Sequence, residues 1–126
     1  MNNVRIRNQG KLYVVGVAAY KNVDCTVKAE TVDWGTFYAG DDVYRTIYLR
    51  NEGNMPFVLN LVFGNWTPAN AGNFMSLTWD YANDTAIMPN LVVPTVFTLH
   101  SVYAPYPNID FVAFSFDITV EAAALL

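Results

Sequence analysis

The sequence predicts an all-β fold, a two-sheet antiparallel sandwich of about seven to eight strands. The first observation is that apolar and polar side chains alternate with period two over several short runs, as in strands with one buried face. The second is that clusters of Gly, Asn, Asp and Pro separate these runs at regular intervals. The third is size, because 126 residues suffice for one hydrophobic core and are too few for two. We therefore expect a single domain over residues 1–126.

The first half of the chain contains four candidate strands. They are residues 4–7, 12–20, 31–33 and 43–50. The first alternates apolar with basic side chains, and Asn8-Gln9-Gly10 is expected to end it. The second is rich in Val and small residues, with Gly16 as a candidate bulge. In the fourth, Ile47 and Leu49 share one face, which predicts a strand with one side buried.

The second half contains four more candidate strands. They are residues 57–63, 75–81, 91–102 and 112–120. The run from Asn51 to Asn54 predicts a hairpin-type connection into the first of them. Thr67 followed by Pro68 predicts an N-cap and the first residue of one short helical turn. Pro94 predicts either an edge strand or a strand with an interruption, because proline cannot donate a backbone hydrogen bond.

Two packed sheets with this strand number favour an immunoglobulin-like sandwich. The Cys–Trp–Cys pattern of antibody domains is missing, since Cys25 is the single cysteine. A jelly roll or a closed barrel is the alternative architecture.

Composition and charge exclude several classes of partner. The formal net charge is −4, which argues against binding to nucleic-acid phosphates. All Lys and Arg lie in the first fifty residues, so a positive N-terminal segment could dock on an acidic patch of a neighbouring copy. No apolar stretch is long enough to span a membrane, and no insertion is expected. Met1 leads directly into polar residues, so we expect either a chain made and used without a secretory signal or a mature or trimmed form.

The chain offers little for catalysis or metal binding. Cys25 cannot form an intrachain disulfide, and we interpret it as a buried small apolar residue, with an interchain bridge as the alternative. His100 lies between strand residues and is expected to be an ordinary outward side chain rather than part of a triad. Asp41 and Asp42 are expected to make local turn hydrogen bonds rather than to bind Ca²⁺. We therefore predict no enzyme, no cofactor and no metal site.

Two groups of residues are candidates for binding. The first is the N-terminal run Val4, Arg5, Ile6 and Arg7, a β-prone segment that either adds to the sheet edge of a neighbouring copy or pairs within its own domain. Residues 1–9 are accordingly a candidate for strand exchange. The second group consists of the loop aromatics Trp66, Tyr103 and Tyr106, which would suit a platform for sugar rings or another ligand.

The order of several short motifs resembles a family of archaeal extracytoplasmic sandwich domains. The matching pieces are Asp33-Trp34-Gly35, Ala39-Gly40-Asp41, Arg50-Asn51-Glu52-Gly53-Asn54, Asn65-Trp66-Thr67-Pro68, Trp79-Asp80-Tyr81 and Ser115-Phe116-Asp117-Ile118. They cover most of residues 11–120. Some such sandwiches build surface filaments in which an N-terminal strand of one subunit completes the sheet of the next. The absent signal also fits a small protein of a spherical virus that infects hyperthermophilic archaea.

The functional expectation is a non-enzymatic structural or assembly module of an archaeal cell surface or virus particle. It would self-associate through β-strand edges, with a second copy or other structural proteins as partners. Few charges and many Tyr side chains, which are enriched at protein interfaces, favour this hypothesis. The alternative is a carbohydrate- or ligand-binding module that uses the loop aromatics.

Overall fold

The computed structural model describes residues 5–102 and 113–125, and for residues 5–11 and 13–15 it describes the backbone only. Eight strands and one short 3-10 helix make up this part of the chain. They are β1 (Arg5–Val15), β2 (Ala18–Tyr20), β3 (Thr31–Tyr38), β4 (Asp42–Arg50), β5 (Phe57–Thr67), η1 (Ala69–Asn73), β6 (Met75–Trp79), β7 (Val92–Ser101) and β8 (Ala113–Ala124). The prediction of an all-β fold is confirmed.

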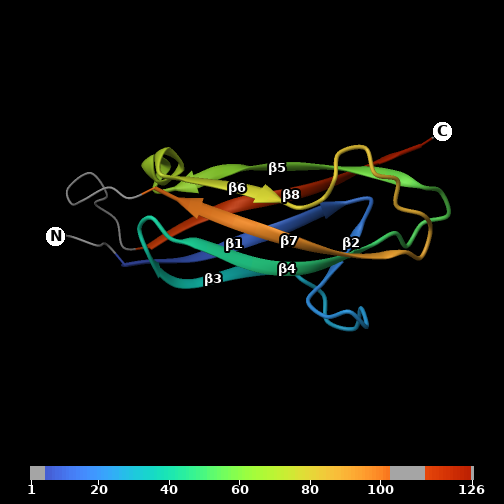
Figure 1. The fold of residues 1–126 in the computed structure, drawn as a ribbon, viewed down its shortest axis with the longest axis horizontal. Helices are drawn as coiled ribbons and strands as arrows, with labels where there is room; N and C mark the ends of the chain where they lie inside the picture. Colours follow the sequence, from blue (N-terminus) through green and yellow to red (C-terminus); the bar gives the residue numbers. More distant parts are fainter. Residues whose placement is uncertain (1–4, 103–112, 126) are drawn as a thin grey trace.

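The strands form two four-stranded sheets. The first sheet has the order β3-β1-β8-β5 and the second the order β2-β4-β7-β6. All pairs are antiparallel except one: β1 and β8 run parallel, from Arg7 opposite Ala113 to Val15 opposite Glu121. In Figure 1 these two strands cross the molecule in the same direction, β1 in blue and β8 in red.

The strand order differs from that of immunoglobulin constant domains. There the first strand lies at the edge of its sheet, in the order A-B-E-D. Here β1 lies inside its sheet, with β3 on one side and β8 on the other. The two-sheet sandwich is therefore confirmed, whereas the immunoglobulin-like topology is not.

The core fills the space between the sheets with the inward faces of the strands. The alternation predicted for the last strand is confirmed, since Phe114, Phe116, Ile118 and Val120 are all buried. Leu49 of β4 and Leu99 of β7 meet them from the second sheet and are fully buried. Burying side chains of this size from both sheets is the main stabilising term for such a fold.

The N-terminal half of the first sheet differs from the prediction in its boundaries. Asn8 to Gly10 does not end a strand, because β1 continues through it and pairs with β8 over that whole stretch. The irregularity appears only against β3, where the register shifts between Asn8 and Gly10. Glycine and asparagine here mark a bulge rather than a turn. β3 likewise runs on past Asp33 to Tyr38.

The predicted hairpin at residues 51–54 is wrong, because β4 and β5 belong to different sheets. The segment crosses between the sheets, and Asn51 is fully buried in the crossing. Its Nδ2 donates to the carbonyl oxygens of Met55 and Ile87, both at 2.8 Å, and its Oδ1 accepts from the Gly53 N–H at 2.9 Å. Asparagine can therefore fix a crossing between sheets by hydrogen bonds from its side chain, and does not always indicate a tight turn.

The short helical turn after Thr67 is confirmed as η1, with Pro68 rather than Thr67 at the N-cap position. Pro94 lies in β7, which is an inner strand of its sheet. β6 pairs only with Phe97–Ser101, so Pro94 has a strand partner on the β4 side alone. At Pro94, β7 has no neighbour on the β6 side, so the missing N–H of proline interrupts no hydrogen bond between β7 and β6.

Cys25 is not buried, so that interpretation is wrong. It lies half-exposed in the loop after β2, outside the strands whose inward faces form the core, and has φ of 56°. In the part of the chain that is described, no helix has the length and apolar character needed to cross a membrane.

Candidate functional site

The N-terminal candidate residues lie within the first sheet. The backbones of Arg5, Ile6 and Arg7 pair with Tyr38, Phe37 and Thr36 of β3, while Val4 lies outside the described residues. This is the intradomain arrangement that the sequence left open. Arg5 and Ile6 pair with β3 alone, and from Arg7 to Lys11 β1 lies in a slot between two other strands, β3 and β8.

The loop aromatics are only partly described, since Tyr103 and Tyr106 lie outside the described residues. Trp66 is half-buried, and its indole stacks on Phe116 with ring centroids 4.2 Å apart and an interplanar angle of 15°. Phe63 contacts it edge-on at 6.4 Å. Gly72 of η1 lies so close that an added Cβ would come within 2.6 Å of the indole. Trp66 therefore packs into the fold and has one ring face already covered.

The sheet edges offer a second kind of binding feature. The edge strands are β3 and β5 in the first sheet, and β2 and β6 in the second. β2 has three residues and β6 has five, so both are short. β3 is longer but carries the charged Asp33, whose carbonyl oxygen accepts from Arg45 Nε at 2.8 Å. Short length, edge charges and side-chain caps all hinder the addition of another strand.

β5 is longer, with eleven residues from Phe57 to Thr67, and carries no charge along its edge. Its sequence FVLNLVFGNWT contains no charged residue and no proline. Val62 is 48% exposed and Phe63 36% exposed, on opposite faces of the strand. A long, uncharged, β-prone edge is the feature that proteins usually avoid unless another strand covers it.

The backbone of β5 is capped at one end and open in the middle. Phe57 exchanges backbone hydrogen bonds with Ile87 at 2.8 and 3.2 Å. The Leu59 N–H donates to Tyr81 Oη at 3.0 Å. Beyond these two residues, no described strand pairs with the outer side of β5. The N–H and C=O groups of Leu61 and Phe63 point to that open side, because odd-numbered residues of β5 face away from β8.

A groove runs beside this open edge, between β5 and β6. Its volume is about 470 Å³, and both strands lie along the same side of the molecule in Figure 1. Apolar side chains from both sheets line it, together with a few polar ones. They are Leu59, Asn60, Leu61, Phe63, Leu77, Thr78, Trp79, Tyr81 and Asn83. Unpaired strand backbone beside apolar pockets is the arrangement by which a sheet accepts an added strand.

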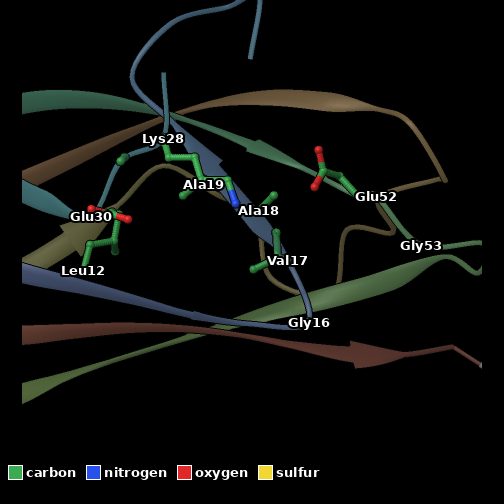
Figure 2. Close-up of a pocket in the computed structure, with 10 residues that line it drawn as sticks. Leu12, Gly16, Val17, Ala18, Ala19, Lys28, Glu30, Glu52 and Gly53 are labelled. Carbon is green, nitrogen blue, oxygen red and sulfur yellow. The ribbon is translucent and has the colours of Figure 1, made fainter. Parts of the chain in front are cut away.

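A second pocket, of about 490 Å³, lies where β1 leads into β2. Figure 2 shows Lys28 between Glu30 and Glu52, above small side chains such as Ala18 and Val17. Glu52 accepts a hydrogen bond from Tyr20 Oη at 2.6 Å, and the Arg50 guanidinium lies 3.9 Å from the same carboxylate oxygen. With mixed charges and shallow apolar walls, this pocket indicates no particular ligand.

One group of side chains has the connectivity of a hydrolase triad. Asp42 Oδ1 lies 3.2 Å from His100 Nδ1, and His100 Nε2 lies 2.7 Å from Thr78 Oγ1. They sit on the outer face of three neighbouring strands, and all are exposed or half-exposed. Even-numbered residues of β6 direct their backbone toward β7, so the Thr78 N–H belongs to the ladder and cannot form an oxyanion hole. The group therefore acts as a cross-strand hydrogen-bond chain.

His100 thus faces outward, as the sequence predicts. The local turn role is confirmed for Asp41, whose carboxylate accepts from the Tyr38 N–H at 3.1 Å, and is wrong for Asp42, whose carboxylate contacts His100 of β7 instead. Among the described residues, no group of three or more His, Cys, Asp or Glu side chains could hold a metal ion.

Comparison with protein-family models and with curated proteins finds no match for this chain. The geometry of the chain itself therefore has to support any functional proposal. The open edge of β5 was not among the predicted sites, although the absence of charge over residues 57–67 was a signal for it.

Proposed function

We propose that this protein is a non-enzymatic structural or assembly module that self-associates through β-strand edges. The observation that supports this most directly is the uncharged, partly open edge of β5 beside an apolar groove. Such an edge promotes pairing with another chain. The location that the motif resemblance implies, an archaeal cell surface or archaeal virus particle, is part of this proposal.

The internal position of β1 is compatible with strand exchange as one route to assembly. β1 occupies a slot between β3 and β8 from Arg7 to Lys11, and it ends at Val15, before Gly16 with φ of 76°. In an exchanged assembly, the same slot would be filled by residues 1–9 of a neighbouring copy. The backbone pairings in the slot would be the same in both cases.

The test is light scattering behind a sizing column over a series of concentrations of the full chain, from about 10 µM to about 1 mM. We expect the average mass to rise above the monomer mass with increasing concentration. A monomer over the whole range would contradict self-association. It would favour the ligand-binding alternative, for which the packed Trp66 gives little support.

A further inference from the structure

We propose that two copies of this chain pair through β5, antiparallel and two-fold symmetric about Val62, so that their first sheets join into one continuous sheet. This inference rests on the proposed self-association and names the surface and the partner, a second copy. It concerns the open stretch of β5 from Asn60 to Gly64.

The direction of the backbone groups fixes the register. Pro56 O accepts from the Leu125 N–H at 2.9 Å, so even-numbered residues of β5 face β8. Odd-numbered residues face outward, and of these Phe57 is bonded to Ile87 and the Leu59 N–H to Tyr81. Leu61 and Phe63 are the positions left in the regular part of the strand, because Asn65 has φ of 57° and the ladder shifts there.

An antiparallel pair centred on Val62 uses these groups completely. Leu61 then lies opposite Phe63 of the second copy, and the two residues exchange both backbone hydrogen bonds. The two-fold axis generates a second such exchange, between Phe63 of the first copy and Leu61 of the second. A register centred on Leu61 would need the Leu59 N–H, which is already bonded to Tyr81. A register centred on Phe63 would need Asn65 in an extended conformation, which its φ excludes.

Charge favours a second copy as the occupant. In a two-fold strand pair, a charged residue on or next to the axis would lie near its own counterpart, and like charges facing each other are destabilising. β5 carries no charge, although the whole chain has a net charge of −4. The other long edge strand, β3, carries the exposed Asp33 near its middle, so a two-fold pair of β3 strands would bring two carboxylates together.

The side chains also fit this register. Val62, 48% exposed on the outer face, would contact Val62 of the second copy across the axis. Phe63, 36% exposed on the inner face, would pack on Leu61 of the second copy at the mouth of the groove. Gly64 has nothing within 4 Å of its Cβ position and so leaves room for Asn60 of the second copy. The contact is small, so we expect a weak, concentration-dependent dimer.

The first experiment compares Val62→Lys with Val27→Lys by the same light-scattering series. Val27 is a loop residue that is 50% exposed, so both variants change the net charge equally at a similarly exposed position. We expect Val62→Lys to weaken dimerisation by about tenfold or more, because two ammonium groups would face each other on the axis. Val27→Lys should associate like the wild-type chain. Urea unfolding should show that both variants remain folded.

The second experiment uses cross-linking, which does not depend on weakening the fold. Facing residues of a non-hydrogen-bonded antiparallel pair have Cα atoms about 4.5 Å apart, within the range that a disulfide bridges. In a Cys25→Ser background, Val62→Cys should therefore yield a disulfide-linked dimer on mild oxidation, and Val27→Cys should not.

The outcomes separate this inference from the proposal on which it rests. Association that Val62→Lys leaves unchanged, together with no cross-link at Val62→Cys, would overturn the β5 pairing and leave self-association standing. A wild-type chain that stays monomeric at every concentration would overturn both.

Discussion

At the scale of single residues, Asn51 is the polar side chain on which the crossing between the sheets depends most. It is fully buried and makes three side-chain hydrogen bonds to backbone groups. Asn51→Ala would leave the Ile87 carbonyl oxygen without that donor inside the core. We expect the free energy of unfolding in urea to fall by about 2 to 4 kcal/mol, because each buried polar group that loses its partner is costly.

Asn54 supplies the matched control for this measurement. It lies in the same segment, is exposed, and should tolerate alanine within about 0.5 kcal/mol. Equal losses from the two substitutions would contradict the anchoring role of Asn51.

Tyr20 gives the protein a pH-dependent contribution to stability. Its hydrogen bond to Glu52 raises the pKa of the phenol above 10.0, and burial and the Glu52 charge act in the same direction. The folded state therefore holds this proton more tightly than the unfolded chain. The stabilisation is fully present below pH 10.0 and is lost as the pH rises through the raised pKa.

The check is urea unfolding at several pH values between about 8 and about 11. The wild-type chain should lose stability over this range more steeply than Tyr20→Phe, which has no proton to release at that position. Parallel pH profiles for the two proteins would contradict the assignment to Tyr20.

The chain of Asp42, His100 and Thr78 should not confer hydrolase activity. The Thr78 N–H is held in the strand ladder and the described side chains of the group lie open to solvent, so its connectivity is insufficient to stabilise a tetrahedral intermediate. We expect hydrolysis of an activated aryl ester by the wild-type protein to equal that by Thr78→Val. A rate that depends on Thr78 would contradict the prediction that the protein is not an enzyme.

The sequence predicted which side chains of a strand are buried better than it predicted where a strand begins and ends. Period-two alternation identified the buried positions of β8, because every second residue from Phe114 to Val120 is apolar and buried. It could not show that Asn8 to Gly10 is a bulge, since such residues occur both in turns and in bulges. Nor could local sequence show that β4 and β5 enter different sheets, because that depends on contacts such as the one between Asn51 and Ile87.

At the scale of elements, η1 and β5 are held together by the fit of Gly72 against Trp66. A Cβ at Gly72 would lie 2.6 Å from Cδ1 and 2.8 Å from Nε1 of the indole, so Gly72→Ala must displace the ring from Phe116. We expect a loss of about 1 to 3 kcal/mol in unfolding free energy, the usual cost of overpacking. A change in tryptophan fluorescence should accompany it.

Gly64→Ala is the control within the same pair of elements. Its Cβ position is open, and alanine suits a strand at least as well as glycine, so stability should be unchanged or slightly higher. If Gly72→Ala were as harmless as Gly64→Ala, the close packing of η1 on Trp66 would be wrong.

The open edge of β5 could not be predicted from sequence patterns, because they do not give the order of strands in a sheet. The uncharged stretch of β5 can be read from the sequence, but whether it lies at an edge depends on strand order. That order includes a parallel pair of β1 and β8, whose partners are about 100 positions apart in the chain. Alternation is the same for edge and inner strands, so it carries no information on this point.

At the scale of the whole molecule, β1 is one of the two inner strands of the first sheet, because it pairs with β3 on one side and β8 on the other. A chain that lacks residues 1–9 would lose the pairings of Arg5 to Gln9 with β3 and β8. We expect its unfolding free energy to be lower by about 3 kcal/mol or more, since several backbone hydrogen bonds are lost together. Urea unfolding compares the truncated and full chains directly.

A synthetic peptide of residues 1–9 then tests whether the slot accepts a strand from another molecule. If strand exchange is feasible, excess peptide should restore stability to the truncated chain in proportion to the logarithm of its concentration, because it binds only the folded state. A peptide of the same composition in scrambled order should not. A truncated chain that the native peptide fails to stabilise would argue against exchange.

The two routes to self-association also differ in what happens on dilution. A dimer that has exchanged β1 can separate only if that strand leaves the interior of the sheet, which requires partial unfolding and is slow. A dimer paired through β5 breaks only the contacts of an exposed edge and should dissociate at once. We therefore expect the dimer to revert to monomer within the time of mixing, as followed by light scattering after rapid dilution. Persistence for hours would assign the assembly to exchange of β1 and contradict pairing through β5.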